Sequence, residues 1–311
     1  MSARPWAHPL GFLFAAGFFG NQAVHVAIAV GAVVAIVSGV VGVFTVIRGQ
    51  AFAGEAFGDV GTAGGSGAYL LGIGPLLGLV IGNVIGAGAM ELIGVQRPRG
   101  RDLATGIVLG AAIGLGALFL YLTVTSSNTT GATQTILFGS VFTIAGSTIP
   151  LILALGLIAL ATIAVLYRPL LLSSVSAEIA AARGIAVRAV GMFYLLALAL
   201  TVALAAITIG TILSTALLVG PAAAALRLTR STPRAMLCAA AIGIAAIWIG
   251  IVLAYDSYHW PPGGRTWPVS FFVVALVFCA YLLSGVPRAI RARRDRRRAA
   301  PERTLQAGAE G

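Results

Sequence analysis

Two carboxylates stand four residues apart in the stretch GQAFAGEAFGDVGTAGGSGAYLLG, residues 49–72, which otherwise consists of apolar and very small residues. On a helix, Glu55 and Asp59 would share one face with about 5–6 Å between their Cβ atoms, so they repel each other unless a proton or a cation lies between them. A charged side chain deep in a membrane helix costs about 2.5–3.5 kcal/mol on insertion scales. The pair therefore predicts a cation site. The alternative is that the acids lie near the helix end, solvated or paired with Arg48, which explains Glu55 better than the deeper Asp59.

The composition is typical of a membrane protein. Of the 311 residues, 59% are hydrophobic and 9% are charged, a balance that no soluble domain has, so we expect an all-α polytopic membrane protein. A helix needs about 20 apolar residues to cross the bilayer. Nine stretches satisfy this rule, and one short pair can also be a single broken helix, which gives eight to nine transmembrane helices. The predicted spans are 23–46, 54–72, 75–94, 104–124, 147–167, 187–208, 210–226, 235–254 and 268–285.

The arginines indicate which face of the protein is cytoplasmic. All 20 basic residues are Arg, the net charge is +11, and only Arg4 and Arg265 fall on the opposite side from the others. The positive-inside rule places the arginine-rich side and the C-terminus in the cytoplasm. The charge then reports topology and attraction to anionic lipid, so nucleic acid is not an expected partner. We expect an N-terminal interfacial segment at 1–21, a transmembrane domain at 22–286 and a basic, disordered cytoplasmic tail at 287–311.

Motifs of common enzymes and ATPases are missing from the sequence. The patterns G-x-x-x-x-G-K-[ST], H-E-x-x-H and G-x-S-x-G do not occur, so we expect neither a P-loop ATP site nor hydrolase chemistry in this chain. Cys238 and Cys279 lie in apolar runs, where thiols are typically inert packing residues. The sequence therefore predicts a protein that is not an enzyme and holds no resident cofactor.

The segment RGQAFAGEAFGDVGTAGG around the two acids resembles the second-helix motif of bacterial zinc/manganese ABC permeases. In that family G-D-A-x-S-H-A-x-x-P-G follows an Arg-Arg-x-Ala opening, and its Asp and His line the metal path. Glu55 stands at the Asp position and Asp59 at the His position, so a carboxylate replaces an imidazole here. Gly58 stands where the family has Ser, and the Pro is absent. The resemblance implies that Glu55 and Asp59 hold a metal ion transiently on a translocation path.

Four further segments resemble the same family in the same order. They are QTILFGSVFTI at 134–144, SAEIAAARGIAVRAV at 176–190, ITIGTILSTALLVGPAAAALRLTRS at 207–231, and YDSYHWPPGGRTWPVSFFVVALVF before and within the last span. Together with the acidic segment they cover about residues 22–286. The chain is thus identified as a member of the ABC-3 type metal permeases, with 22–286 as its permease domain.

Residues 176–184 are expected to form a short, Ala-rich, amphipathic helix on the cytoplasmic face. The helix contains Glu178, Ala182 and Arg183 and ends at Gly184 as its C-cap. This is the form of a coupling helix that seats in a groove of an ATPase subunit. A plain connecting loop is the alternative.

Two other places are candidates for a role in transport. Pro221 after Gly220 interrupts a span and frees backbone carbonyls for a neighbour, water or an ion, although a packing kink explains the pair equally well. Asp256 and His259 in the outer loop are candidates for contacting a metal or a partner. Glu91, near a cytoplasmic helix end, is expected to be solvated and not a ligand.

The resemblance implies the permease subunit of an ABC importer for a divalent transition metal, zinc or manganese, in the bacterial plasma membrane. Two copies, or one copy and a close paralogue, would form one path at their interface. Two copies of a separate ATP-binding subunit would hydrolyse ATP, and an extracytoplasmic metal-binding protein would deliver the ion. Carboxylates suit manganese, but zinc accepts them too. Two alternatives remain open: a secondary transporter with Glu55 and Asp59 as an ion-coupling pair, and an ABC permease for an iron chelate or cobalamin.

Overall fold

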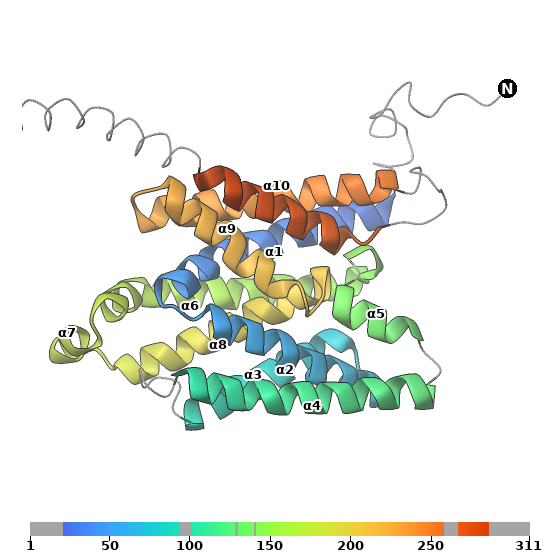
Figure 1. The fold of residues 1–311 in the computed structure, drawn as a ribbon, viewed down its shortest axis with the longest axis horizontal. Helices are drawn as coiled ribbons and strands as arrows, with labels where there is room; N and C mark the ends of the chain where they lie inside the picture. The colour runs from blue at the N-terminus through green and yellow to red at the C-terminus, as the bar shows by residue number, and fades with distance from the viewer. Residues whose placement is uncertain (1–20, 94–100, 128–129, 140, 258–266, 286–311) are drawn as a thin grey trace, which may run out of the picture.

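The computed structural model describes residues 21–93, 101–127, 130–139, 141–257 and 267–285, and this part of the chain is helical with short connections and no strand. Figure 1 shows the long helices side by side, with α7 at one end of the molecule and α5 at the other. The helices are α1 (Gln22–Ile47), α2 (Ala51–Leu70), α3 (Pro75–Ile93), α4 (Arg101–Ser127), α5 (Thr130–Phe138), η2 (Val141–Thr143), η3 (Gly146–Thr148), α6 (Ile149–Val175), α7 (Ala177–Ala182), α8 (Val187–Ile209), α9 (Ser214–Leu228), α10 (Thr232–Asp256) and a last helix, Val269–Gly285.

Helices form at all nine predicted positions, but only some of them have the length and hydropathy of a membrane span. Within the described residues six qualify, namely α1, α3, α4, α6, α8 and α10, while α9 and the last helix are shorter. α2 has 20 residues, but six are glycines and two are acids. Glycine costs about 1 kcal/mol relative to Ala in a helix interior, so neighbouring helices must hold α2 in place. The all-α polytopic class is confirmed, whereas the count of eight to nine transmembrane helices is not.

α1 and α8 form the core of the molecule. Of the residues in the most apolar stretch of each helix, 72% are buried in α8 and 61% in α1, whereas only 22% are buried in α4 and in α6. Tyr194, Leu195, Leu198 and Leu204 of α8 are fully buried, as expected for a helix that is apolar on all sides. The outer helices expose large apolar side chains such as Val165, a surface suited to lipid.

α2 and α3 pack backbone against backbone through glycines. A Cβ atom on Gly64 would collide with the Gly78 carbonyl, and one on Gly82 would lie 2.9 Å from the Gly64 Cα. Small residues at a crossing let membrane helices approach this closely. Because the two backbones touch, a shift of α3 must also shift α2. This contact sets the position of the helix that carries Glu55 and Asp59.

α5 was not among the predicted elements, and its end packs into the break between α8 and α9. Gly139 after α5 has φ +72° and Gly210 after α8 has φ +91°, conformations that glycine adopts readily and other residues rarely. A Cβ on Gly139 would lie 2.6 Å from the Thr208 carbonyl oxygen. The Thr211 N–H donates to the Ile136 carbonyl at 3.0 Å. The turn predicted between the sixth and seventh spans is therefore a tight junction with a separate helix.

Candidate functional site

Glu55 and Asp59 lie on successive turns of α2, toward its start at the α7 end. With a rise of 1.5 Å per residue, Glu55 is about 6 Å and Asp59 about 12 Å beyond the first residue of α2. Glu55 is exposed and Asp59 is half-buried. Within the described residues, no hydrogen bond or ion pair joins either acid to another side chain, and Arg48 donates to Ser173. The two negative charges are therefore not matched by the rest of the described chain.

A groove of about 530 Å³ opens beside Glu55, between α2, α9 and the last helix. Apolar side chains such as Val219 and Val277 form its walls, and Thr215 and Tyr281 contribute hydroxyl groups. Because Glu55 is exposed in this groove, its carboxylate is accessible to an ion or to another chain. The sequence could not predict this arrangement, since the last helix lies about 220 residues further along the chain than α2.

One copy of the chain supplies too few ligands for a closed metal site. Among the residues that the structure describes, no group of three or more His, Cys, Asp or Glu side chains could hold one ion. An oxygen-liganded ion such as Mg²⁺ or Mn²⁺ takes about six ligands. Two carboxylates leave most of these positions to water or to a second chain. The arrangement suits an ion that is held briefly and then released.

Two hydroxyl residues continue the line of acids along α2, and the sequence analysis missed them. Thr62 and Ser66 follow Glu55 by seven and eleven residues, and this spacing places all of them with Asp59 on one helix face. Thr62 Oγ1 donates to Thr211 Oγ1 at 2.7 Å, and Ser66 Oγ donates to the Thr62 carbonyl at 2.6 Å. Both side chains are buried. The spacing i, i+4, i+7, i+11 was the signal that would have revealed this polar face.

α7 lies where a short helix was expected, and both of its ends are capped. Ser176 Oγ accepts a hydrogen bond from the Ile179 N–H at 3.2 Å, which is an N-cap. Gly184 has φ +79°, and its N–H donates to the Ala181 carbonyl at 2.9 Å. This left-handed glycine is the usual way to end a helix. The caps make α7 a defined element and not a plain loop.

One side of α7 is free of contacts with the rest of the described chain. Glu178, Ala182, Arg183 and Gly184 are all exposed. Ile179 is also 52% exposed. An exposed apolar side chain between two charged ones is suited to contact with another protein.

Gly220 and Pro221 do not break a helix, which was one of the two readings of this pair. α9 runs unbroken from Ser214 to Leu228 with Pro221 inside it. A Cβ on Gly220 would collide with Val277 of the last helix, so this glycine allows two helices to pack closely. Of the two readings of the pair, the structure supports packing.

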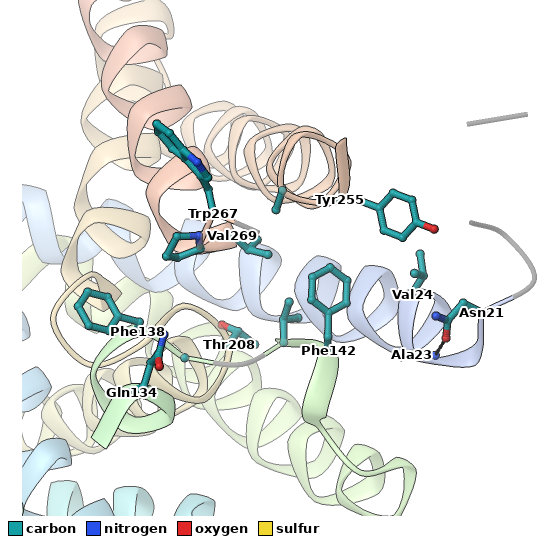
Figure 2. A pocket seen from close by; sticks show the side chains of 14 residues that line it. Asn21, Ala23, Val24, Gln134, Phe138, Phe142, Thr208, Tyr255, Trp267 and Val269 are labelled. Carbon is teal, nitrogen blue, oxygen red and sulfur yellow. Dashed lines mark hydrogen bonds between the residues drawn. The ribbon is translucent and has the colours of Figure 1, made fainter. Parts of the chain in front are cut away.

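The other candidate residues lie far from the acids. Asp256 is the last residue of α10, at the α5 end, and His259 lies outside the described residues. A pocket of about 630 Å³ opens at this end, and Figure 2 shows Phe138, Tyr255 and Trp267 around it. Among the described residues that line this pocket there is no His, Cys, Asp or Glu. The described lining is mainly aromatic and apolar, with the side-chain amides of Asn21 and Gln134.

Glu91 is paired, so the expectation that it is solvated was wrong. Its Oε1 accepts a hydrogen bond from Arg188 Nε at 2.8 Å, which joins the end of α3 to the start of α8. The Glu91 side chain is only 11% exposed, whereas that of Arg188 is 79% exposed. The local sequence gave no sign of the pair because its partners are 97 residues apart.

The chain is similar to known membrane transport proteins in sequence and in fold. The profile of the ABC 3 transport family matches residues 21–283. The chain is 35% identical over 242 residues to the manganese transport system membrane protein MntC of Halalkalibacterium halodurans, covering 76% of this chain and 79% of that protein. It is 28% identical over 238 residues to the manganese import system permease protein ScaB of Streptococcus parasanguinis, covering 76% and 82%. PsaBC from Streptococcus pneumoniae in complex with Fab has a similar fold, with a TM-score of 0.74 and 24% identity over 88% of this chain and 95% of that chain.

Proposed function

Because the chain belongs to the ABC 3 transport family and is thus the permease subunit of an ABC importer for a divalent metal ion, we propose that it carries manganese. It is a transporter subunit and not an enzyme. The observation that carries the choice of metal is the pair Glu55 and Asp59, because carboxylate and water suit manganese whereas imidazole suits zinc. The names of the relatives MntC and ScaB support the same choice.

We place the ion path at the contact between two permease copies, or between one copy and a close paralogue. Glu55 is exposed in an open groove of a single chain. Two copies would bring four carboxylates together, and their mutual repulsion would be offset by a divalent ion between them. Within one described chain the metal-binding side chains are too few, so a second copy is the natural source of the others.

The α7 end is proposed to face the cytoplasm of a bacterial cell, with the C-terminus on the same side. The positive-inside rule supports this orientation. The proposal also takes α2, α9 and the last helix as membrane-crossing helices, which would give nine spans together with the six that meet the length and hydropathy of a span. The described arginines with placed side chains all lie toward the α7 end: Arg48, Arg168, Arg183, Arg188, Arg227, Arg230 and Arg234.

Two further partners follow from this orientation. Two copies of an ATP-binding subunit would sit beneath the permeases and contact α7, whose exposed side carries Glu178 and Arg183. An extracytoplasmic metal-binding protein would dock at the α5 end, where Asp256 lies. ATP binding would bring the ATPases together and displace α7, and the helices would then release the ion from Glu55 and Asp59 to the cytoplasm.

Metal uptake by neutralised variants tests this proposal. We would reconstitute the permease with its ATPase and binding protein in proteoliposomes and measure uptake of labelled manganese and zinc. Glu55→Gln and Asp59→Asn should each lower ATP-dependent manganese uptake by more than about tenfold, because each removes a ligand charge. Asp102→Asn is the control, since this exposed acid starts α4 away from the groove.

Each part of the proposal can fail separately. Wild-type uptake by both neutral variants would exclude Glu55 and Asp59 from the path. Faster uptake of zinc than of manganese by the wild type would overturn the choice of metal and leave the path intact. Manganese uptake by the permease without any ATPase, driven by an ion gradient, would overturn the assignment of the energy source.

A further inference from the structure

α7 is continuous in sequence with α6 and α8, so a force on α7 acts first on their adjoining turns. Ser176 ends α6 and caps α7, and Arg188 lies in the first turn of α8, shortly after Gly184. Figure 1 shows α7 projecting from the end of the packed helices. The contacts made by these adjoining turns therefore decide where a displacement of α7 goes.

The first such contact is the ion pair between α8 and α3. Arg188 Nε donates to Glu91 Oε1 at 2.8 Å. The second oxygen of Glu91, Oε2, is buried and has no hydrogen-bond partner among the described residues, so within this part of the chain the carboxylate depends on Arg188. Arg188 itself is mostly exposed, and exposed ion pairs contribute little to stability. A bond that adds little to folding but fixes one helix to another is suited to transmitting movement.

The second contact joins α6 and α8 to the start of α2. Arg48 lies between α1 and α2, and its Nη1 donates to Ser173 Oγ in the last turn of α6 at 3.0 Å. The Arg48 guanidinium also lies over the ring of Tyr194 of α8, 5.1 Å from the centroid. Tyr194 is fully buried, and its hydroxyl is 2.8 Å from Thr45 Oγ1. One side chain thus contacts both helices that flank α7.

Both contacts lead to α2. Arg48 caps the end of α1, three residues before α2 begins, and α3 touches α2 through the backbones at Gly64 and Gly78, where no side chain could be accommodated. α2 carries Glu55 and Asp59. A displacement of α6 or α8 at the α7 end should therefore move α2 in two places, near its first residues and along the side that contacts α3.

We propose that Arg188–Glu91 and Arg48–Tyr194 are two joints that transmit movement of α7 to the acids of α2. The proposal rests on the proposed function, because it takes α7 as the element that the ATPase moves. These four are positioning residues, since they act on the ion through α2 and do not touch it. Loss of a joint should leave ATP hydrolysis running while fewer ions are carried.

The number of manganese ions transported per ATP hydrolysed, in the reconstituted complex, tests the proposal. Arg188→Gln and Glu91→Gln should each lower this ratio by about threefold or more, the size typical of broken coupling between sites. The exchange variant Glu91→Arg with Arg188→Glu should restore at least half of the ratio, because the pair reforms in reverse. Tyr194→Leu, which removes the ring under Arg48, should lower it more than Tyr194→Phe, which removes only the hydroxyl.

An unchanged ratio in Arg188→Gln and in Tyr194→Leu would overturn the proposal, as would an exchange variant that recovers nothing. Arg188 is exposed, so its variant should fold even if a change at the buried Tyr194 does not. Asp102→Asn is the control for a charge lost at the same end of the molecule, and it should keep the wild-type ratio.

A separate variant distinguishes this proposal from the role of α7 itself. Glu178→Arg should weaken co-purification of the ATPase, whereas the joint variants should co-purify at wild-type levels. If Glu178→Arg also binds the ATPase normally and transports normally, the coupling role of α7 fails. If only the joint variants behave like wild type, the joints fail and the role of α7 stands.

Discussion

Two of the regions that hold carboxylates within helices, Glu91 of α3 and the pair on α2, differ in whether the described chain supplies the opposite charge. Glu91 of α3 lies against Arg188 of α8 and is largely buried by that contact. Glu55 and Asp59 of α2 lie on one helix face, with Glu55 in an open groove, and the described chain offers them no ion pair or hydrogen bond. In the first region one chain supplies both the carboxylate and its opposite charge. In the second region the described chain supplies only the carboxylates.

On the proposed function, this difference separates residues that position helices from residues that meet an ion or another chain. A matched carboxylate fixes one helix to another, so its loss should weaken the structure or its movements. An unmatched pair raises the energy of the empty chain, because like charges repel at about 5–6 Å and a membrane helix disfavours charge. On the proposed function, such a pair persists because a cation offsets the repulsion.

Among variants that keep a ligand at each position, the largest effect should come from changing the chemistry of the unmatched pair. Asp59→His places an imidazole where the resembled family has one, and imidazole suits zinc better than carboxylate does. We expect uptake to persist while the ratio of manganese to zinc falls by about tenfold, which corresponds to about 1.4 kcal/mol. Competitive uptake of the two labelled metals by the reconstituted complex measures this ratio.

The conservative variant Asp59→Glu serves as the control, since it keeps an oxygen ligand and should keep the preference for manganese. An unchanged metal ratio in Asp59→His would mean that this side chain does not contact the ion. The unmatched region would then need another explanation.

The two regions should also differ, by a smaller effect, in how their variants change the free energy of unfolding. Glu91→Gln removes one partner of an ion pair and should lower the free energy of unfolding by up to about 1 kcal/mol, the usual range for a partly exposed pair. Glu55→Gln and Asp59→Asn remove charges that repel each other, so they should leave stability unchanged or raise it slightly. Thermal unfolding of the purified permease in detergent, with the metal removed, measures all three variants.

The comparison between the two regions fails if these stability changes have the opposite signs. A clear loss of stability in Glu55→Gln or Asp59→Asn would show that these acids have stabilising partners within one chain. They would then be structural residues like Glu91, and the groove would lose its significance.

The sequence predicted the helices well because each long apolar run carries its own signal. It missed α5, whose nine residues are too few to register as a span. It predicted the turn at Gly210 between the sixth and seventh spans, but it left open whether Gly220 and Pro221 mark a helix break or close packing, because proline usually interrupts a helix. In the structure the glycine before Pro221 allows Val277 of a distant helix to pack against it. Local composition does not contain that contact.

The acidic pair could be found from the sequence because its signal is local, two charges at helical spacing in an apolar stretch. The ion pair of Glu91 could not, since Arg188 lies 97 residues away. The same holds for the contact of Arg48 with Tyr194 and for the helix that forms the far wall of the groove. Tertiary structure alone brings these residues together, so the contacts around α2 could not be predicted, whereas the acidic pair that forms the candidate site could be read from the sequence.

Electron paramagnetic resonance of Mn²⁺ bound to the purified complex tests the central claim, that Glu55 and Asp59 hold the ion, most directly. We predict one bound Mn²⁺ for each pair of permease copies, with a signal typical of oxygen ligands. This signal should disappear in the Glu55→Gln, Asp59→Asn double variant and remain in Asp102→Asn. The same bound Mn²⁺ signal in the double variant would contradict the claim.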